Sequence, residues 1–326
     1  MKENGILIIS LDFELYWGVR DQFTKEAYTD NLLGVQQAIP AILKLFEQYR
    51  IHATWAIVGF LYFQNKQELL AYLPSIKPNY IDRTLCPYKY LDSLPHCSQV
   101  DPFHFSPSLI QLISTYPFQE IGTHTFSHYY CLAKGQSSRA FQEDLKQAIA
   151  VGKKFGYVPH SIVFPRNQVN EKYLQICKKM GITSYRGTEK SWFYQTSEKS
   201  HKQWIKRFLR LIDAYLPLSG HNCYQIDQIK RDIPFNIAAS RFLRPFSKSL
   251  RVFEIFRLKR ILSDLTYAAK KGAIYHLWWH PHNFGVNLRE NIIFLQKILE
   301  HFLKLQHRYG MKSMNMDELS QKLSAI

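Results

Sequence analysis

The chain has 326 residues, of which 46% are apolar, and this is enough to bury the core of one barrel domain or of two smaller domains. The formal net charge of +16 indicates an anionic partner, such as an acidic glycan, a membrane surface or a nucleic acid. The sequence contains no run of 18 apolar residues, so a membrane-spanning helix is not expected, and the first residues do not resemble a secretion signal. Five cysteines without C-x-x-C spacing predict reduced thiols and a cytoplasmic protein.

Apolar, β-branched runs alternate with segments of helical periodicity along most of the chain. We expect strands at residues 6–11, 52–60, 120–124, 161–164, 182–186, 273–279 and 311–316. We expect helices at residues 31–49, 66–73, 106–116, 138–155, 170–180, 255–271, 288–309 and 317–324. Because strand and helix alternate, the strands should form a parallel sheet, and seven of them predict an α/β barrel that is closed or partly open.

Residues 188–254 break this alternation and carry much of the charge. From Lys202 to Arg260 there are 13 basic and 4 acidic side chains, and residues 204–215 have the pattern of a basic amphipathic helix. We interpret the segment first as a lid or side subdomain with a solvated basic face. Contact with an anionic membrane surface or a lipid-linked substrate is the second interpretation, and nucleic acid is the least favoured partner.

Two pairs of polar residues at the ends of predicted strands have metal-site spacing. Asp12 and Glu14 end the first strand at positions i and i+2, so both carboxylates point the same way and repel each other unless a cation or an arginine is close. His124 and His128 follow the third strand with i, i+4 spacing, and both rings would lie on one face if the chain turns into a helix there. The alternative for the acids is a capping role, and a lone H-x-x-x-H is a weak signal.

Two further strand ends carry a basic residue. Arg166 follows Phe-Pro at the end of the fourth strand, where a bidentate hydrogen bond from its side chain would keep a carboxylate base ionised. His280 ends the apolar run AIYHLWW and is a candidate general acid for a leaving group. His276 and His282 compete for that role, and His280 is preferred because it lies nearest the rim of the barrel. A turn arginine and a core histidine are the alternatives for these two positions.

Together these motifs resemble the polysaccharide deacetylase family, also called carbohydrate esterase family 4 or the NodB-like homology domain. The matching positions are Asp12 and Glu14, His124 and His128, Phe164–Arg166, and His280. The resemblance covers roughly residues 5–187 and 272–320, and it implies a distorted (β/α)7 barrel. The whole chain, 1–326, would then be a single barrel domain with a basic helical insertion, 188–254, before the sixth strand.

The resemblance also implies a set of roles. A divalent metal ion, with zinc as the expected ion, would be held by Glu14, His124 and His128. Asp12 would be the catalytic base, kept ionised by Arg166, although the roles of the two acids are open to exchange. His280 would protonate the departing amine. The chain departs from the family in having Asp-Phe-Glu in place of adjacent aspartates, and in lacking a clear match to the aspartate of the fourth motif.

The predicted function is metal-dependent removal of an N-acetyl group from an amino sugar in a glycan or glycan precursor. The protein would act in the cytoplasm, peripheral to the inner face of the membrane if its substrate is lipid-linked. One alternative is a hydrolase of another non-peptide C–N bond, such as a cyclic amide, or a glycosidase that uses Asp12 and Glu14 as its carboxylate pair. A non-catalytic glycan- or membrane-binding barrel is an alternative of a different class.

Overall fold

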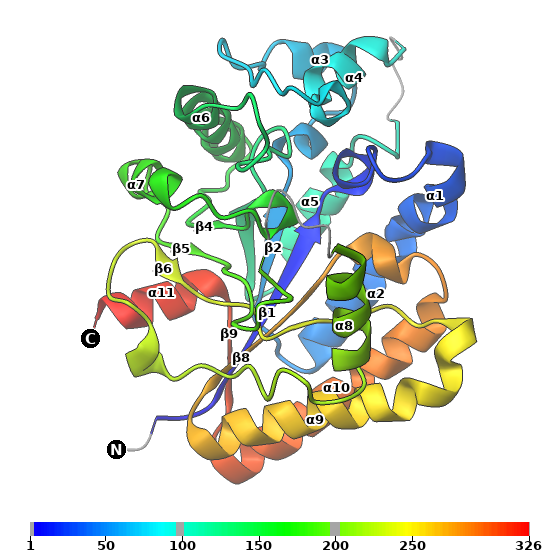
Figure 1. Ribbon diagram of the computed structural model, residues 1–326, viewed down its shortest axis with the longest axis vertical. Coiled ribbons are helices and arrows are strands. Elements are labelled where there is room, and N and C mark those ends of the chain that lie inside the picture. The colour runs from blue at the N-terminus through cyan, green and yellow to red at the C-terminus, as the bar shows by residue number, and fades with distance from the viewer. Residues whose placement is uncertain (1–2, 96–100, 196–202, 326) are drawn as a thin grey trace.

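The described residues form a curled sheet of parallel strands with helices around it (Figure 1). The computed structural model describes residues 3–95, 101–195 and 203–325. The strands are β1 (Ile6–Phe13), β2 (Ala53–Ile57), β3 (Gln119–Thr123), β4 (Ser161–Ile162), β5 (Ser184–Tyr185), β6 (Phe235–Asn236), β7 (Arg241–Phe242), β8 (Ile274–Trp279) and β9 (Lys312–Met314). The helices are α1 (Lys25–Leu33), α2 (Val35–Gln48), α3 (Lys66–Leu70), α4 (Pro87–Ser93), α5 (Pro107–Thr115), α6 (Ser138–Lys154), α7 (Glu171–Lys179), α8 (Gln203–Asp213), α9 (Glu254–Lys271), α10 (Leu288–Tyr309) and α11 (Met316–Ser324).

Strand β1 is the centre of the sheet. The strand order is β6-β5-β4-β3-β2-β1-β8-β7, and every pair along it is parallel. β9 and β2 share one edge of β1, since Ile6–Ile8 pair with β9 and Ile9–Phe13 pair with β2. The parallel, helix-covered sheet confirms the predicted α/β barrel, and each of the seven strands expected from the sequence is present.

Two further short strands, β6 and β7, were missed by the sequence prediction and form the two ends of the sheet. Residues 235–239 bond to the strand containing β5, because the amides of Phe235, Ile237 and Ala239 donate to the carbonyls of residues 183, 185 and 187. Residues 240–243 then cross to β8, where the amides of Ser240 and Leu243 donate to the carbonyls of residues 276 and 278. The segment 188–254 therefore contributes a wall of the barrel and is not only an insertion, while its residues 196–202 lie outside the described part.

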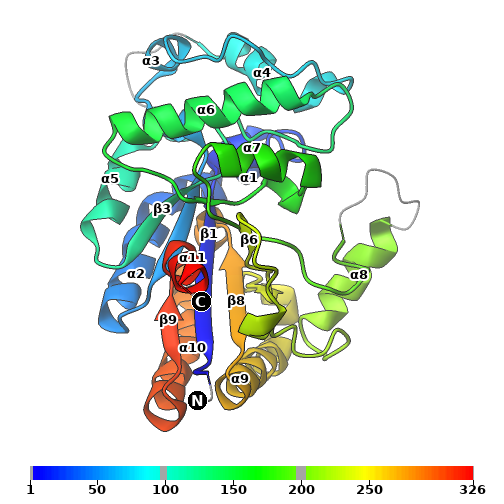
Figure 2. The ribbon, with the colours of Figure 1, turned by 90° about the vertical axis from the view of Figure 1, so that its left-hand side faces the viewer.

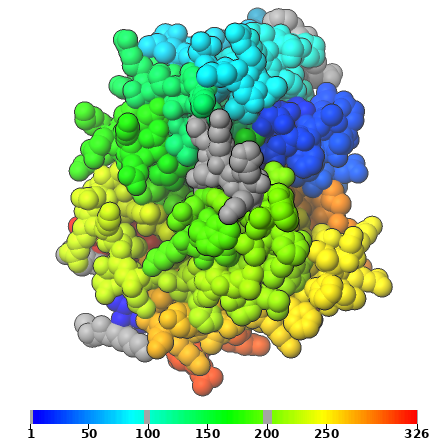
Figure 3. All heavy atoms as spheres, in the orientation of Figure 1, coloured from blue at the N-terminus to red at the C-terminus, as the bar shows by residue number. Residues whose placement is uncertain are grey.

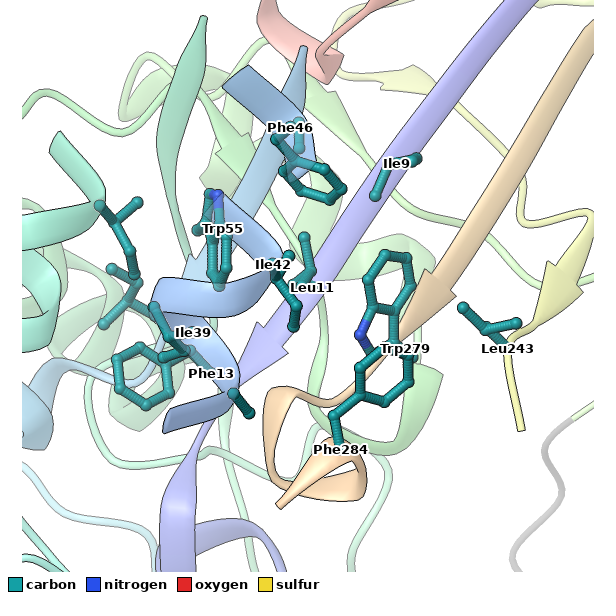
Figure 4. Close-up of a cluster of buried hydrophobic side chains, with 14 of the residues drawn as sticks. Ile9, Leu11, Phe13, Ile39, Ile42, Phe46, Trp55, Leu243, Trp279 and Phe284 are labelled. Atoms are coloured by element: carbon teal, nitrogen blue, oxygen red, sulfur yellow. The ribbon is translucent and has the colours of Figure 1, made fainter. Parts of the chain in front are cut away.

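The two faces of β1 have different surroundings. Ile9, Leu11 and Phe13 point outward and pack against α2 in the main apolar core (Figure 4). This follows from helical spacing in α2, which directs Ile39, Ile42 and Phe46 to that side. The alternate residues of β1 face the barrel interior, where Ile6 and Ile8 fill the lower part. Ser10 and Asp12 therefore point into the upper part of the barrel.

The amino and carboxyl ends of the strands have different surroundings. β1 and β8 run side by side, and α3, α4 and α6 lie beyond the carboxyl ends of the strands (Figure 2).

None of the helices in the described part of the chain has the length and apolar character that a membrane span requires. Cys86, Cys131, Cys177 and Cys223 are unpaired, as predicted, and Cys97 lies outside the described residues.

Candidate active site

Glu14, His124 and His128 meet at the carboxyl end of β1 and β3. The carboxylate atom Oε2 of Glu14 lies 3.2 Å from Nε2 of His124 and 3.0 Å from Nε2 of His128. All three side chains are buried, and their ligand atoms lie within 4.8 Å of one another. Gly18 makes room for them, because a Cβ at this position would lie 1.9 Å from Cδ of Glu14. The three residues proposed as metal ligands are thus brought together.

The histidine pair forms in a different way from the helix that the sequence suggested. Residues 124–128 are not helical, and His128 has left-handed backbone with φ of 58°. Asp144 of α6 supports this loop by accepting hydrogen bonds from the amides of Phe126 and Ser127 and from the Ser127 hydroxyl. Such backbone costs on the order of 1–3 kcal/mol in a non-glycine residue and persists only where the surroundings hold it. Asp144 therefore positions the second histidine.

The protonation pattern of these groups fits a cation. Nδ1 of His124 donates to the carbonyl of Val163 at 2.8 Å, so Nε2 of the neutral ring carries no proton. The lone pair on Nε2 of His124 then faces a carboxylate oxygen of Glu14. Because both of these atoms are hydrogen-bond acceptors, their contact needs a cation or an additional proton between them. Burial lowers the pKa of His128 to about 4, which keeps that ring neutral. Burial alone would raise the pKa of Glu14, but the adjacent histidines hold it well below its ordinary value. A carboxylate and two imidazole nitrogens are ligands that suit zinc.

Asp12 is paired with Arg186, which lies just beyond β5, and not with Arg166. The two guanidinium nitrogens of Arg186 donate to the two carboxylate oxygens of Asp12 at 2.7 and 2.6 Å. Both side chains are buried, and although burial opposes ionisation, Arg186 lowers the pKa of Asp12. A third bond from Arg186 reaches Ser10 at 2.9 Å. Asp12 is thus an oriented carboxylate at the floor of the site.

The expectation that Arg166 holds Asp12 is wrong. Arg166 has left-handed backbone with φ of 56°, and its side chain pairs with Asp21 and lies over the ring of Tyr130. Arg166 remains at the rim of the site cavity, so it is near the chemistry but does not contact the base. The strand predicted at residues 182–186 ends in Arg186. This strand-end position was the sequence signal that would have identified Arg186 as a site residue.

His280 lies between the two acids. Its Nε2 is 3.7 Å from Oδ2 of Asp12 and 3.5 Å from Oε1 of Glu14, and its side chain is 23% exposed. The other ring nitrogen, Nδ1, lies 3.4 Å from the amide of Asn283, whose carbonyl accepts a hydrogen bond from Tyr28. In the described part of the chain, no carboxylate bonds to Nδ1 of His280. The side-chain amide of Asn283 is thus the described group next to Nδ1 of His280.

The two competing histidines have other surroundings. His276 is fully buried below the site, where it bonds the carbonyl of Ile237 at 3.0 Å and the Ser10 hydroxyl at 2.8 Å. Burial lowers its pKa to about 3, so it stays neutral and supports Ser10 and, through it, Arg186. His282 is also buried, with a pKa lowered to about 3 by burial, and stacks on His280 with ring centroids 5.0 Å apart. His280 is the member of the three that reaches both acids.

A cavity of about 360 Å³ opens onto this group. Asp12, Glu14, His128 and His280 line its floor, and Tyr28, Phe242 and Trp278 supply aromatic surface. Sugar rings commonly pack on such aromatic faces, and 360 Å³ is the size of a small-ligand site. The site thus combines an ionised carboxylate, a candidate metal centre and a partly exposed histidine around one cavity.

Comparisons with known proteins agree with this fold. Residues 29–185 match the family model of polysaccharide deacetylases, which confirms the resemblance that the motifs predicted. A search of curated proteins found no match. The structure is similar to one from Mycobacterium smegmatis assigned as a polysaccharide deacetylase, with a TM-score of 0.58, 11% identity, and coverage of 99% of this chain and 91% of that one.

Two other solved structures are similar to nearly the whole chain. A probable polysaccharide deacetylase from Pseudomonas aeruginosa PAO1 has a TM-score of 0.56 and 10% identity, with 98% of this chain and 90% of that chain covered. The allantoinase PuuE has a TM-score of 0.57 and 11% identity, with 99% and 91% covered. At these identities the likeness shows the shared fold alone.

Proposed function

We propose that the protein is a metal-dependent hydrolase that removes the N-acetyl group from an amino sugar in a glycan or glycan precursor. The contact of Glu14 with both His124 and His128, beside an ionised Asp12, is the observation that carries the proposal. The polysaccharide deacetylase match of residues 29–185 supports the reaction class.

A divalent ion, zinc in the first instance, would be held by Glu14, His124 and His128 and would supply Lewis acidity toward the amide carbonyl and an attacking water. Asp12 takes the proton from that water, because Arg186 keeps its carboxylate ionised and fixed in direction. His280, at the end of the neighbouring strand β8, reaches the same space and delivers a proton to the departing amine. The products are acetate and a free amino group.

Metal stoichiometry and acetate release test this proposal together. Purified protein loaded with zinc should bind one ion per chain and release acetate from an N-acetylated sugar. His124→Ala should lose both properties, while His307→Ala, an exposed histidine on α10, should retain them. Unchanged metal content in His124→Ala, together with no acetate from a broad substrate panel, would refute the proposal.

Hydrolysis of a cyclic amide is the second candidate, and the fold shared with an allantoinase is the observation that favours it. The same metal-loaded protein should then open allantoin and leave N-acetylated sugars intact. The metal-loss variant His124→Ala would lose that activity too, so the substrate panel separates the two reactions and the metal content does not.

We also propose that the protein contacts an anionic membrane surface through α8 and the start of α9. Trp204 and Phe208 of α8 are 69% and 56% exposed, and Val252, Phe253, Ile255 and Phe256 are similarly exposed nearby. These two segments lie on the same face, and Tyr215 contacts Phe253 with ring centroids 6.3 Å apart (Figure 3). Exposed aromatic and aliphatic side chains beside basic ones favour an interfacial location. A cytoplasmic location stays a prediction.

Vesicle flotation tests this contact. The protein should bind vesicles that contain anionic phospholipid, and binding should weaken as salt is raised. Trp204→Glu combined with Phe208→Glu should abolish binding, whereas Ile81→Glu, at an equally exposed apolar residue elsewhere, should not. Equal flotation of the two variants would contradict the proposal.

A further inference from the structure

A second cavity adjoins the candidate active site. It has a volume of about 420 Å³, and six of its lining residues also line the site cavity. The shared wall includes Trp278, Phe242 and His280, so a ligand at the site can extend from one cavity into the other without leaving the protein surface. The second cavity is therefore part of the same substrate path.

Five arginines line this second cavity, and two of them are neutralised by carboxylates of the described residues. Arg166 pairs with Asp21, and Arg241 pairs with Asp213 and Asp264. The other three arginines are Arg207, Arg210 and Arg244. Among the described residues none of these three makes an ion pair with a carboxylate, and the Nε atom of Arg210 donates only to a backbone carbonyl. The cavity wall thus carries three uncompensated guanidinium groups.

The fold holds these charges close together although they repel one another. Burial and neighbouring arginines lower the pKa of Arg210 and of Arg244. Among the described lining residues Glu189 carries the single carboxyl, and burial raises its pKa to about 7, so it is only partly ionised at neutral pH. Its Oε1 atom is buried without a hydrogen-bond partner. An anion in the cavity would relieve the repulsion, and protonated Glu189 is able to donate a hydrogen bond to it.

The orientation of α8 is the reason that the arginines face the cavity. Arg207 and Arg210 lie three residues apart on this helix and both line the cavity, while Trp204 and Phe208, one turn apart, are exposed. Asp213, at the end of the helix, is buried and accepts hydrogen bonds from Tyr194, Ser219 and Arg241. These bonds fix the end of α8 against the barrel strand β7, so the basic side has a defined direction.

We propose that this cavity binds a phosphoryl group attached to the N-acylated sugar, so that the substrate is a phosphorylated or diphosphate-linked amino sugar. A carboxylate would compensate one of the three positive charges, whereas a phosphate monoester carries about −1.5 to −2 at neutral pH. Guanidinium forks match phosphate oxygens in geometry and bind them through paired hydrogen bonds. The identity of the sugar in this inference rests on the proposed deacetylation. The phosphate site itself is independent of that reaction.

Binding of inorganic pyrophosphate tests the site independently of turnover. Isothermal titration of the metal-loaded protein should show saturable binding that weakens as salt is raised. Arg210→Gln combined with Arg244→Gln should weaken it by more than about tenfold. Arg251→Gln, which removes an exposed charge outside the cavity, should change it by less than about twofold. Equal affinity in the wild type and the double variant, or no binding at millimolar concentration, would overturn the inference.

Turnover then identifies the source of the phosphate. The ratio of kcat/KM for N-acetylglucosamine 1-phosphate to that for N-acetylglucosamine should exceed one and should fall in the double variant. A matched comparison of a nucleotide diphosphate sugar with a polyprenyl diphosphate sugar in detergent distinguishes a soluble carrier from a lipid carrier, and preference for either supports the site. Equal turnover of neutral and phosphorylated sugars would overturn it. Pyrophosphate binding without any acetate release would refute the proposed deacetylation and leave the phosphate site standing.

Discussion

Two arginines at the ends of neighbouring strands should respond very differently to the same substitution. Arg186→Met breaks a bidentate pair in which Arg186 is 0% and Asp12 is 4% exposed. Loss of one partner from such a buried pair costs about 3–5 kcal/mol, because the other charge is left without compensation. Arg166→Met removes a side chain that is 31% exposed, and pairs of that kind contribute about 0–1 kcal/mol, with a comparable amount from the contact with Tyr130.

Urea denaturation of the metal-free protein at pH 7 measures both changes. Arg186→Met should lower the free energy of unfolding by at least about 2 kcal/mol more than Arg166→Met does. Adding Asp12→Asn to Arg186→Met should restore part of the loss, because the unpaired carboxylate is then absent. The reasoning is refuted if the two single variants are equally stable, or if Asp12→Asn makes the Arg186 variant worse.

The pH dependence gives a second measurement on the same variants. Arg186 lowers the pKa of Asp12, so in the wild type the stabilisation is present above the unfolded value near 3.8 and is lost as the pH falls through the folded value. In Arg186→Met, burial is no longer opposed by the arginine, and the pKa of Asp12 should rise. The stability deficit of the variant should therefore be largest at neutral pH and should shrink as the solution is acidified. A deficit that grows toward acid would contradict this account.

Three further changes probe the support of the site. Asp144→Ala removes the acceptor for the loop that carries His128, so zinc affinity should fall about 10- to 100-fold in a competition titration, as for other residues that orient ligands. Gly18→Ala places a methyl group against Glu14 and should abolish zinc binding while the circular dichroism spectrum stays that of the wild type. Burial lowers the pKa of His276 to about 3, so the unfolded chain binds a proton there below about 6.5 and the folded chain does not. Stability of the wild type should therefore fall as the pH drops from 6.5 toward 3, and His276→Asn should flatten that slope in acid denaturation curves.

Much of the barrel was predictable because β1, β2 and β8 are apolar runs and the long helices have clear periodicity. Strands β6 and β7 were not, because residues 235–243 mix apolar with polar side chains, follow a proline, and are held by partners that lie far away in the sequence. Local propensity cannot identify a strand whose stability comes from long-range pairing.

The candidate site was predictable where the strand ends decide it. Asp12, Glu14 and His280 lie at the carboxyl ends of neighbouring strands, and the parallel sheet brings such ends together. The assignment of Arg166 as the partner of Asp12 failed because the direction of a side chain after a strand depends on the backbone of the turn, and Arg166 turns away with φ of 56°. The role of Asp144 had no sequence signal. The sequence of a helix does not distinguish a buried aspartate from an exposed one, and the loop that Asp144 supports contacts it only in the folded structure.

The position of β1 between partners from distant parts of the chain has a consequence for synthesis. Its neighbours along one edge are residues 53–57 and 312–314, and along the other edge residues 274–279. While the chain emerges from the ribosome, one whole edge of this acid-bearing strand has no partner until about residue 279 is available. A nascent chain shorter than this exposes unpaired backbone of the kind that drives aggregation. Chaperone dependence in the cell should therefore be set by the late arrival of β8, and not by the order in which the helices form.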